Sequence, residues 1–276
     1  MKPRQGPRTA YRLGVEYDGS RFQGWQKQSE RQVAQGVRTV TGTLERVLHE
    51  AKQQPLTLGG SGRTDAGVHS LGQVAHLHLP SAGAPKPQEL QRIFDEGLPS
   101  DVAITSIHAC STSFHSRHDA LTRTYLYQLS LRRSAFGKSM LWWVKSRMEL
   151  QRLEEAWSLF AGNHDAAAFS DLEAGEDSHV QIKSCEVAKD GSLIMLRLTA
   201  GFFLRRQVRR MVGAAVLCGL GKEKIERLRR DLENPTPEST LHWAEKAAPA
   251  AGLFLERVRY PGDPENSPLV PILRVP

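Results

Sequence analysis

One stretch of the sequence combines very little side-chain bulk with three groups capable of chemistry. Residues 59–69 read GGSGRTDAGVH, and Arg63, Asp65 and His69 stand among glycines and other small residues. Glycines leave the backbone free to adopt unusual dihedrals and let a ligand approach it closely. We therefore expect a large ligand to reach the Asp65 carboxylate. The alternative interpretation is an ordinary tight loop in which Asp65 caps the next turn.

The neighbouring residues narrow the chemistry open to Asp65. His69, His76 and His78 have no cysteine or acidic partners at ligand spacing, which disfavours a metal site. The Gly-Lys-Ser/Thr of a phosphate-binding P-loop does not follow the glycines. The stretch also lacks the nucleophile elbow of a Ser-His-Asp hydrolase and the second carboxylate of a glycosidase. What remains is a carboxylate acting alone, as a covalent nucleophile or as an electrostatic partner.

A carboxylate that must stay ionised beneath a substrate needs a cation nearby. Arg63 is two residues away, and the segment FFLRRQVRRMVG, residues 202–213, supplies four more arginines. On a helix Arg205 and Arg209 share a face with Val212, which places at least one of them at the edge of the core. For most of these arginines a solvated basic face is the competing interpretation.

Composition favours a polyanionic partner. The 276 residues include 37 Lys and Arg against 30 Asp and Glu, a formal charge of +7, which suits nucleic acid. A merely soluble basic protein fits the charge equally well. Three scattered cysteines indicate reduced thiols. Without an apolar run of signal-peptide or membrane-span length, we expect a soluble cytoplasmic protein with no membrane partner.

The elements that position these groups follow one order twice. Apolar alternation and turn signals predict strands, and apolar residues at helical spacing predict helices. The first half has expected strands at 11–17, 56–59, 73–79 and 102–110, with helices at 38–53 and 88–96. The second half has expected strands at 122–131, 179–188, 193–200 and 253–260, with helices at 149–161, 205–218 and 222–232.

This repeated β-α-β-β-α-β order predicts an α/β (α+β) protein of two tandem ferredoxin-like units. Their antiparallel sheets are expected to form a shared RNA-binding platform. The domains are expected at residues 1–111, with the aspartate loop, and at 112–262. A Pro-rich tail, residues 263–276, is expected to lie on the surface.

Five blocks, in order along nearly the whole chain, resemble a single known family. They are EYDGSRFQGWQKQ, GGSGRTDAGVHSLGQVAH, FHSRHDALTRTYLY, FLRRQVRRMVG and APAAGLFLERVRYP. With these blocks the chain closely resembles the tRNA pseudouridine synthase A family and its pseudouridine synthase fold. The resemblance implies isomerisation of uridine to pseudouridine at positions 38, 39 and/or 40 in the anticodon stem-loop of tRNA. It also implies a homodimer that needs neither cofactor nor metal.

The resemblance also implies roles for individual residues. Asp65 falls on the family's catalytic nucleophile, and Arg209 on the arginine that pairs with it. Tyr125 falls on a tyrosine held to stack under the target base and assist proton transfer. Arg63 is implicated in pushing that base out of the stack. The strip expected to contact tRNA comprises Phe114, His115, Ser116, Arg117 and His118.

The isomerisation breaks the N-glycosidic bond, rotates the uracil and rejoins it through carbon. Asp65 can act by adding to the uracil ring, by attacking the sugar, or by promoting loss of a sugar proton, and the sequence does not choose among these routes. Two rival functions stay open. One is a tRNA-binding module without catalysis, and the other is a hydrolase that releases free uracil.

Two segments depart from a simple interpretation. The loop at residues 171–179 is acidic, where members of the family often carry a basic or Ser-Arg-containing stretch, so we assign no tRNA contact to it. Trp142 and Trp143 stand among Lys138, Lys145 and Arg147. The edge of a packed core is the favoured interpretation there, and stacking on nucleic acid is the alternative.

Overall fold

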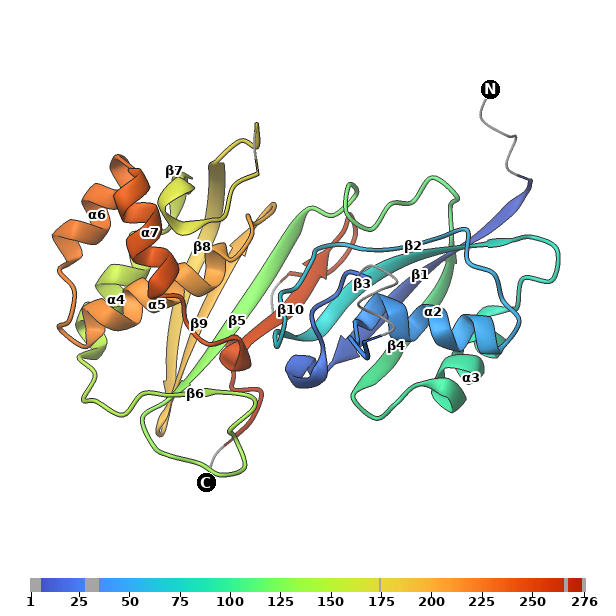
Figure 1. Cartoon of the computed structure of the whole chain (residues 1–276), viewed down its shortest axis with the longest axis horizontal. Coiled ribbons are helices and arrows are strands. Elements are labelled where there is room, and N and C mark those ends of the chain that lie inside the picture. The colour runs from blue at the N-terminus through green and yellow to red at the C-terminus, as the bar shows by residue number, and fades with distance from the viewer. Residues whose placement is uncertain (1–5, 28–34, 174, 266–267, 275–276) are drawn as a thin grey trace. The chain divides into compact units, whose positions relative to one another are not determined.

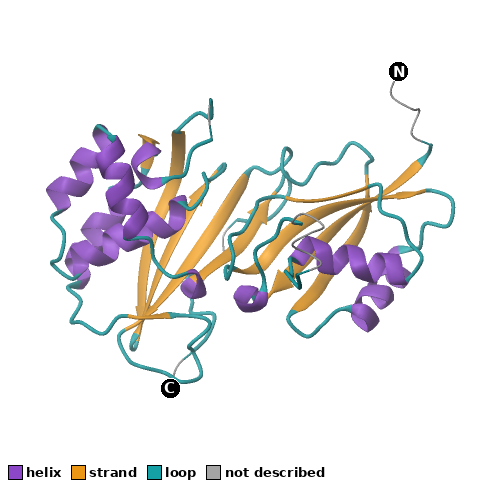
Figure 2. Cartoon of the chain, viewed as in Figure 1, coloured by secondary structure: helices purple, strands orange, loops and turns teal. Residues whose placement is uncertain are grey.

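The computed structural model describes residues 6–27, 35–173, 175–265 and 268–274 (Figure 1). The chain separates into two compact units. Unit 1 comprises residues Met1–Leu121 and Leu255–Pro261, and unit 2 comprises residues Thr122–Phe254 and Gly262–Pro276. Each unit carries helices packed on a mainly antiparallel sheet, as Figure 2 shows by colour. The predicted mixed α/β architecture is therefore confirmed. The shared RNA-binding platform stays a prediction.

The sheet of unit 1 has the strand order β4-β1-β3, and two further strands pair with β3. These are β2 and the part of β10 that belongs to this unit. The strands are β1 (Arg8–Tyr17), β2 (Thr57–Gly60), β3 (His69–Pro80), β4 (Val102–Cys110) and β10 (Leu253–Arg259), and the helices are the 3-10 turn η1 (Gly19–Arg21), α2 (Val40–Glu50) and α3 (Pro87–Gly97).

The core of unit 1 lies between its sheet and its two helices. Leu13 and Val15 alternate with more exposed residues along β1, so one face of the strand is apolar. That face packs against Leu44 of α2 and Phe94 of α3 in one buried cluster. Helix α2 starts where the Thr39 side chain accepts a hydrogen bond from the Gly42 amide, which satisfies one of the free amides of its first turn.

The sheet of unit 2 has the order β5-β9-β8-β7, with β6 in parallel beside β5. Helices α4, α5, α6 and α7 belong to this unit and are labelled in Figure 1. The strands are β5 (Thr122–Ser130), β6 (Trp142–Trp143), β7 (Gly162–Asp165), β8 (His179–Asp190) and β9 (Leu193–Ala200). The helices are α4 (Leu150–Ser158), η2 (Ala167–Phe169), α5 (Gln207–Gly219), α6 (Ile225–Glu233), α7 (Pro237–Glu245) and η3 (Ala250–Gly252).

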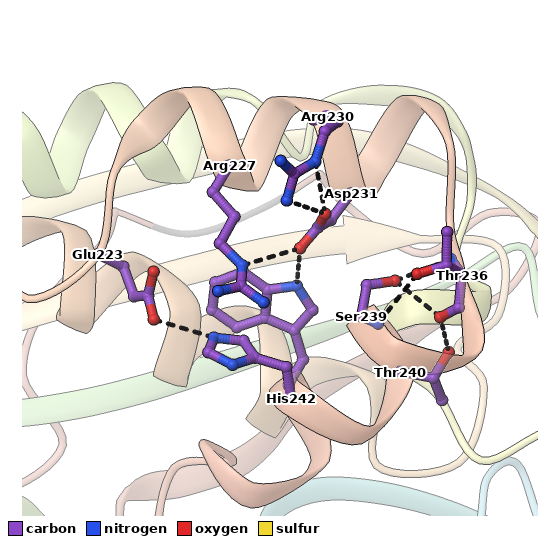
Figure 3. Close-up of polar contacts among 9 residues, drawn as sticks. Glu223, Arg227, Arg230, Asp231, Thr236, Ser239, Thr240 and His242 are labelled. Atoms are coloured by element: carbon purple, nitrogen blue, oxygen red, sulfur yellow. Dashed lines mark hydrogen bonds and ion pairs between the residues drawn. The ribbon is translucent and has the colours of Figure 1, made fainter.

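Helix α7 was absent from the predicted elements, and a buried carboxylate joins it to α6 (Figure 3). Asp231 is 3% exposed. Its Oδ2 accepts a hydrogen bond from Nε1 of the buried Trp243 at 3.0 Å, and its Oδ1 accepts from Arg230 at 3.2 Å. Arg227 lies 3.5 Å from Oδ2. Sequence patterns do not predict α7 because it begins at Pro237 in a stretch with two prolines, which is typical of a linker. In the structure a capping box at Thr236 starts the helix.

The division into units differs from the predicted domains at two places. Residues 112–121 cluster with unit 1, where the Leu121 amide donates a hydrogen bond to the Arg259 carbonyl. Residues 255–261, at the end of the last predicted strand, also belong to unit 1. These groupings depend on pairing between segments far apart in sequence, which local patterns do not report.

The C-terminal segment is also more closely packed than the prediction of a surface tail implies. Leu269 and Ile272 pack against a buried cluster that contains Leu126 and Leu141. The Ile272 amide donates a hydrogen bond to Oε1 of the buried Gln128 at 2.5 Å. Prolines restrict the helical and strand conformations of this segment, but its aliphatic side chains still gain by leaving water. Among the helices of the described ranges, every one is too short or too polar to span a lipid bilayer.

Candidate active site

The loop that carries Asp65 joins the end of β2 to the start of β3. Asp65 is half-buried and Arg63 is exposed. The start of the loop is fixed by Gln73, whose side chain is fully buried on β3. Its Oε1 accepts from the Ser61 hydroxyl at 2.6 Å, and its Nε2 donates to the Gly62 carbonyl at 2.9 Å. One buried amide thus orients the chain just before Arg63 and Asp65.

Thr64 anchors the centre of the loop, between the two predicted site residues. It is buried, and its hydroxyl lies 2.8 Å from the hydroxyl of Tyr17. Burial raises the pKa of Tyr17 to about 12, with hydrogen bonds such as that to Thr64 opposing the rise. The Thr64 carbonyl accepts from the Trp25 amide at 3.1 Å. Arg63 and Asp65 therefore flank a residue that is held from both its side chain and its backbone.

Residues of the block EYDGSRFQGWQKQ, to which the resemblance assigned no role, contact this loop. Gly24 has a φ of +97°, and a Cβ at this position would collide with the Thr64 carbonyl oxygen. The Phe22 carbonyl accepts a hydrogen bond from the Gly67 amide at 3.1 Å. The glycine at position 24 is thus required both by its backbone conformation and by the closeness of the aspartate loop.

His69, the imidazole of the quoted stretch, is a buried structural group. It is 1% exposed at the start of β3, and its Nδ1 accepts from the Gly19 amide at 3.1 Å. The same nitrogen lies 3.1 Å from the Asp18 carboxylate. Within the residues that the structure describes, no group of three or more His, Cys, Asp and Glu side chains is arranged to hold a metal ion.

The strip at residues 114–118 lies in unit 1 and is fastened through its middle residue. Ser116 is fully buried. Its hydroxyl donates to the Gly59 carbonyl at 2.9 Å and lies 2.8 Å from Nδ1 of His76. The Tyr260 hydroxyl donates to the Ser116 carbonyl at 2.6 Å. The Ser116 side chain therefore faces the interior of unit 1, and the tRNA contact of the strip stays a prediction.

Histidine rings lie in and beside this strip and contact one another. The ring centroids of His76 and His115 are 4.4 Å apart, and those of His115 and His118 are 4.2 Å apart. Nδ1 of His115 accepts from the Arg117 amide at 3.2 Å. Burial, and then the neighbouring His115 and His78, lower the pKa of His76 to about 4. The strip leaves Arg117 and His118 exposed, while Phe114 and His115 are half-buried.

Tyr125 and Arg209 lie in unit 2. Tyr125 is 8% exposed on β5, and its ring meets the Phe203 ring edge-to-face with centroids 5.2 Å apart. Arg209 is half-buried on α5, and its Nε donates to the Ala248 carbonyl at 2.8 Å. The placement of Arg209 at the edge of the core agrees with its predicted face, whereas Arg205 is exposed. The pairing of Arg209 with Asp65 stays a prediction.

The arginine next to Arg209 has a structural role that the sequence did not reveal. Arg210 is 2% exposed and pairs with Asp171 of the acidic loop. It also donates to the Ser170 carbonyl at 2.8 Å. Arg206 lies 3.3 Å from the same carboxylate. Asp171 therefore neutralises a buried arginine, which gives a reason for an acidic residue where the family often carries a basic stretch.

Comparison with known proteins defines the class of enzyme. Residues 14–119 and 156–261, which make up most of the chain, match the family model described as tRNA pseudouridine synthase. The fold is the one expected for a pseudouridine synthase, and the class is an isomerase. The chain belongs to the tRNA pseudouridine synthase family.

Full-length relatives agree with this assignment. The chain is 33% identical over 262 residues to tRNA pseudouridine synthase A of Thermodesulfovibrio yellowstonii, covering 90% of this chain and 98% of that protein. It is 36% identical over 259 residues to the protein of that name from Rhodospirillum rubrum, covering 92% and 88%. For the Maricaulis maris protein of the same name the values are 34% over 256 residues, 91% and 98%. The resemblance drawn from the five sequence blocks is confirmed.

Proposed function

We propose that this isomerase converts uridine to pseudouridine at positions 38, 39 and/or 40 in the anticodon stem-loop of tRNA. The observation that carries the proposal is the half-buried Asp65 on a loop whose neighbouring residues are fixed by Gln73 and Tyr17. A preorganised loop holds a reacting group in place without the cost of ordering it when substrate binds. The family match and the relatives named tRNA pseudouridine synthase A support the same reaction.

In the proposed reaction Asp65 is the catalytic carboxylate. The bond between N1 of uracil and C1′ of ribose breaks, and a bond forms between C5 and C1′. The proton on C5 leaves to solvent and N1 takes up a proton, so the product is an isomer of the substrate. Addition to the ring, attack on the sugar and promotion of sugar-proton loss all use an ionised carboxylate. We propose that Arg209 supplies the positive charge that keeps Asp65 ionised beneath the substrate.

Access to the uridine requires that its base leave the helical stack, which costs a few kcal/mol. We propose that Arg63 occupies the vacated space, because its side chain is exposed next to the anchored Thr64. Tyr125 is proposed to stack against the extruded base and to assist proton transfer. Its edge-to-face contact with Phe203 restricts the orientation of its ring, which favours stacking at low entropic cost.

The tRNA contacts proposed for the strip rest on its four members other than Ser116. Arg117 and His118 are exposed and suit phosphate and base contacts, and Phe114 and His115 offer partly exposed rings. Ser116 is proposed to position the strip instead. We further propose that the protein acts in the cytoplasm as a homodimer. Light scattering of the purified protein over a range of concentrations tests the dimer directly.

The first experiment measures tritium release from tRNA labelled at C5 of uridine, with the wild type and Asp65→Ala side by side. Asp95→Ala, which removes an exposed carboxylate from α3, is the matched control. We expect release by the wild type and the control, and tRNA binding without release by Asp65→Ala. Accumulation of free uracil would establish the hydrolase, and tRNA binding without release by the wild type would establish the binding module. Primer extension after carbodiimide treatment locates the modified uridines.

A further inference from the structure

Residues 131–147 of unit 2 carry charge of one sign only. They contain five cations and no acidic residue, and all five cations are exposed. None of them forms an ion pair with a residue that the structure describes. In Figure 1 this segment is the light-green loop around the β6 label. The cations are Arg132, Arg133, Lys138, Lys145 and Arg147.

The segment also presents aromatic surface to solvent. The Phe136 side chain is 94% exposed, the highest value among the large hydrophobic residues that the structure describes. Trp143 is 38% exposed, and the Arg133 guanidinium lies 5.6 Å from the centre of its ring. An unburied phenylalanine at this exposure gains nothing from the fold, so its apolar surface is available to a ligand.

The base of the segment is held firmly, so its exposed side chains project from an ordered support. Ser130 at the end of β5 accepts from the Arg132 amide through its hydroxyl at 3.2 Å. Gln128 donates to the Met140 carbonyl at 3.4 Å. Leu141 is 4% exposed and belongs to a buried cluster that the C-terminal Leu269 and Ile272 cover.

A second basic patch on unit 2 differs from residues 131–147 in how far its charge is neutralised. A depression of about 440 Å³ is lined by residues 221–224 with Arg227 and Arg230. Both arginines contact the buried Asp231, and Glu223 of the same lining lies 2.9 Å from His242 (Figure 3). Much of that charge is neutralised within the unit, whereas the charge of residues 131–147 is not.

We infer that residues 131–147 form an additional RNA-contacting surface for the tRNA substrate. Phe136 stacks on an unpaired or terminal base, and the five cations face phosphates. Stacking on an aromatic ring combined with a positively charged backbone track is how proteins hold unpaired nucleotides. Five exposed cations with no acidic residue among them complement the phosphates of tRNA, so tRNA fits this segment better than a second copy of the chain does. The inference rests on the proposed tRNA substrate, and it identifies a part of the chain that binds it.

The test measures the Kd of the full-length protein for an in vitro transcribed tRNA at several salt concentrations. Phe136→Ala is expected to raise Kd about fivefold or more, the loss of one stacking contact. The double variant Arg132→Ala, Arg133→Ala is expected to raise Kd and to lower the slope of log Kd against log salt by about 1 to 2. Turnover at saturating tRNA is expected to stay at the wild-type level for both.

Matched controls remove the same groups elsewhere in unit 2. Leu241→Ala removes another side chain that is 64% exposed, and Arg229→Ala with Lys246→Ala removes two exposed cations. The inference is overturned if the segment variants bind tRNA like the wild type, or if the controls weaken binding equally. It is also overturned if the variants keep tRNA affinity and lose affinity for phosphatidylglycerol vesicles. Failure of the proposed function is a separate result, namely no tritium release by the wild type.

Discussion

The hydroxyl of Ser116 lies 2.8 Å from Nδ1 of His76 and donates to the Gly59 carbonyl at 2.9 Å. A buried serine thereby ties the strip at residues 114–118 to the strand that leads into the aspartate loop. A Cβ at Gly59 would lie 2.6 Å from the His76 ring, so a larger residue there would push the ring away. The strip and the loop are therefore placed by one small hydrogen-bonded cluster in unit 1.

Ser116→Ala tests the positioning role of this cluster. Removing the hydroxyl leaves the Gly59 carbonyl without this donor, which is expected to lower the free energy of unfolding by about 1 to 2 kcal/mol. Because the strip is proposed to contact tRNA, KM is expected to rise several-fold while kcat changes little. Steady-state tritium release at varied tRNA concentrations measures both. Ser116→Thr, which keeps the hydroxyl, should recover part of the effect on KM, and equal KM values in Ser116→Ala and the wild type would contradict the positioning role.

Stability is expected to fall on acidification through His76. Burial and nearby histidines lower its folded-state pKa to about 4, from a usual value of 6.5. Between these values the unfolded chain binds a proton that the folded chain does not. The free energy of unfolding therefore falls as pH drops from about 6.5 to about 4, by up to about 3 kcal/mol.

Urea unfolding at a series of pH values measures this dependence. His76→Gln is expected to flatten it relative to the wild type, since the titrating ring is gone. His179→Gln is the control, because the His179 side chain is 61% exposed. A wild-type curve with the same pH dependence as His76→Gln would show that another group is responsible.

Gly24→Ala is expected to impair catalysis through the aspartate loop. The φ of +97° strains an alanine, and its Cβ collides with the Thr64 carbonyl oxygen, next to Asp65. Gly83→Ala is the matched control, because Gly83 has a φ of +79° and open space around it. Both variants carry the backbone strain, about 1 to 2 kcal/mol.

Only Gly24→Ala displaces the loop, and a displacement of about 1 Å can reduce the rate about 100-fold. Single-turnover tritium release under conditions where both variants are folded separates the two effects. Equal rates for Gly24→Ala and Gly83→Ala would mean that the glycine serves folding alone.

Asp231→Ala is expected to destabilise unit 2. It leaves the Nε1 of Trp243, a fully buried residue, without its acceptor, at a cost of about 1 to 3 kcal/mol. Arg227 and Arg230 are partly exposed and can be hydrated by water, so they add less. Asp190→Ala, which removes a half-exposed carboxylate near Arg274, is the control and should change stability by less than about 0.5 kcal/mol. Chemical denaturation of the purified variants provides the comparison.

The elements that sequence patterns located best are those with strong local signals. The strand at 11–17 and the helix at 38–53 correspond to β1 and α2, because apolar alternation and helical spacing record which side chains must leave water. Short β7 and the proline-started α7 have no such pattern and were missed. Sequence patterns favoured the edge of a packed core for Trp142 and Trp143, with stacking on nucleic acid as the alternative. In the structure Trp142 is half-buried and Trp143 is exposed.

The sequence by itself determined the family and the aspartate loop, because both are carried by residue types at fixed spacing. Only the tertiary structure decided that Ser116 faces the interior, that Arg210 is neutralised by Asp171, and that Leu269 and Ile272 cover a core cluster. The physical reason is that burial and hydrogen bonding between residues tens of positions apart depend on which surfaces meet after folding. The spacing of residues along the chain records the chemistry that each side chain offers, but it does not record the partner that each side chain meets.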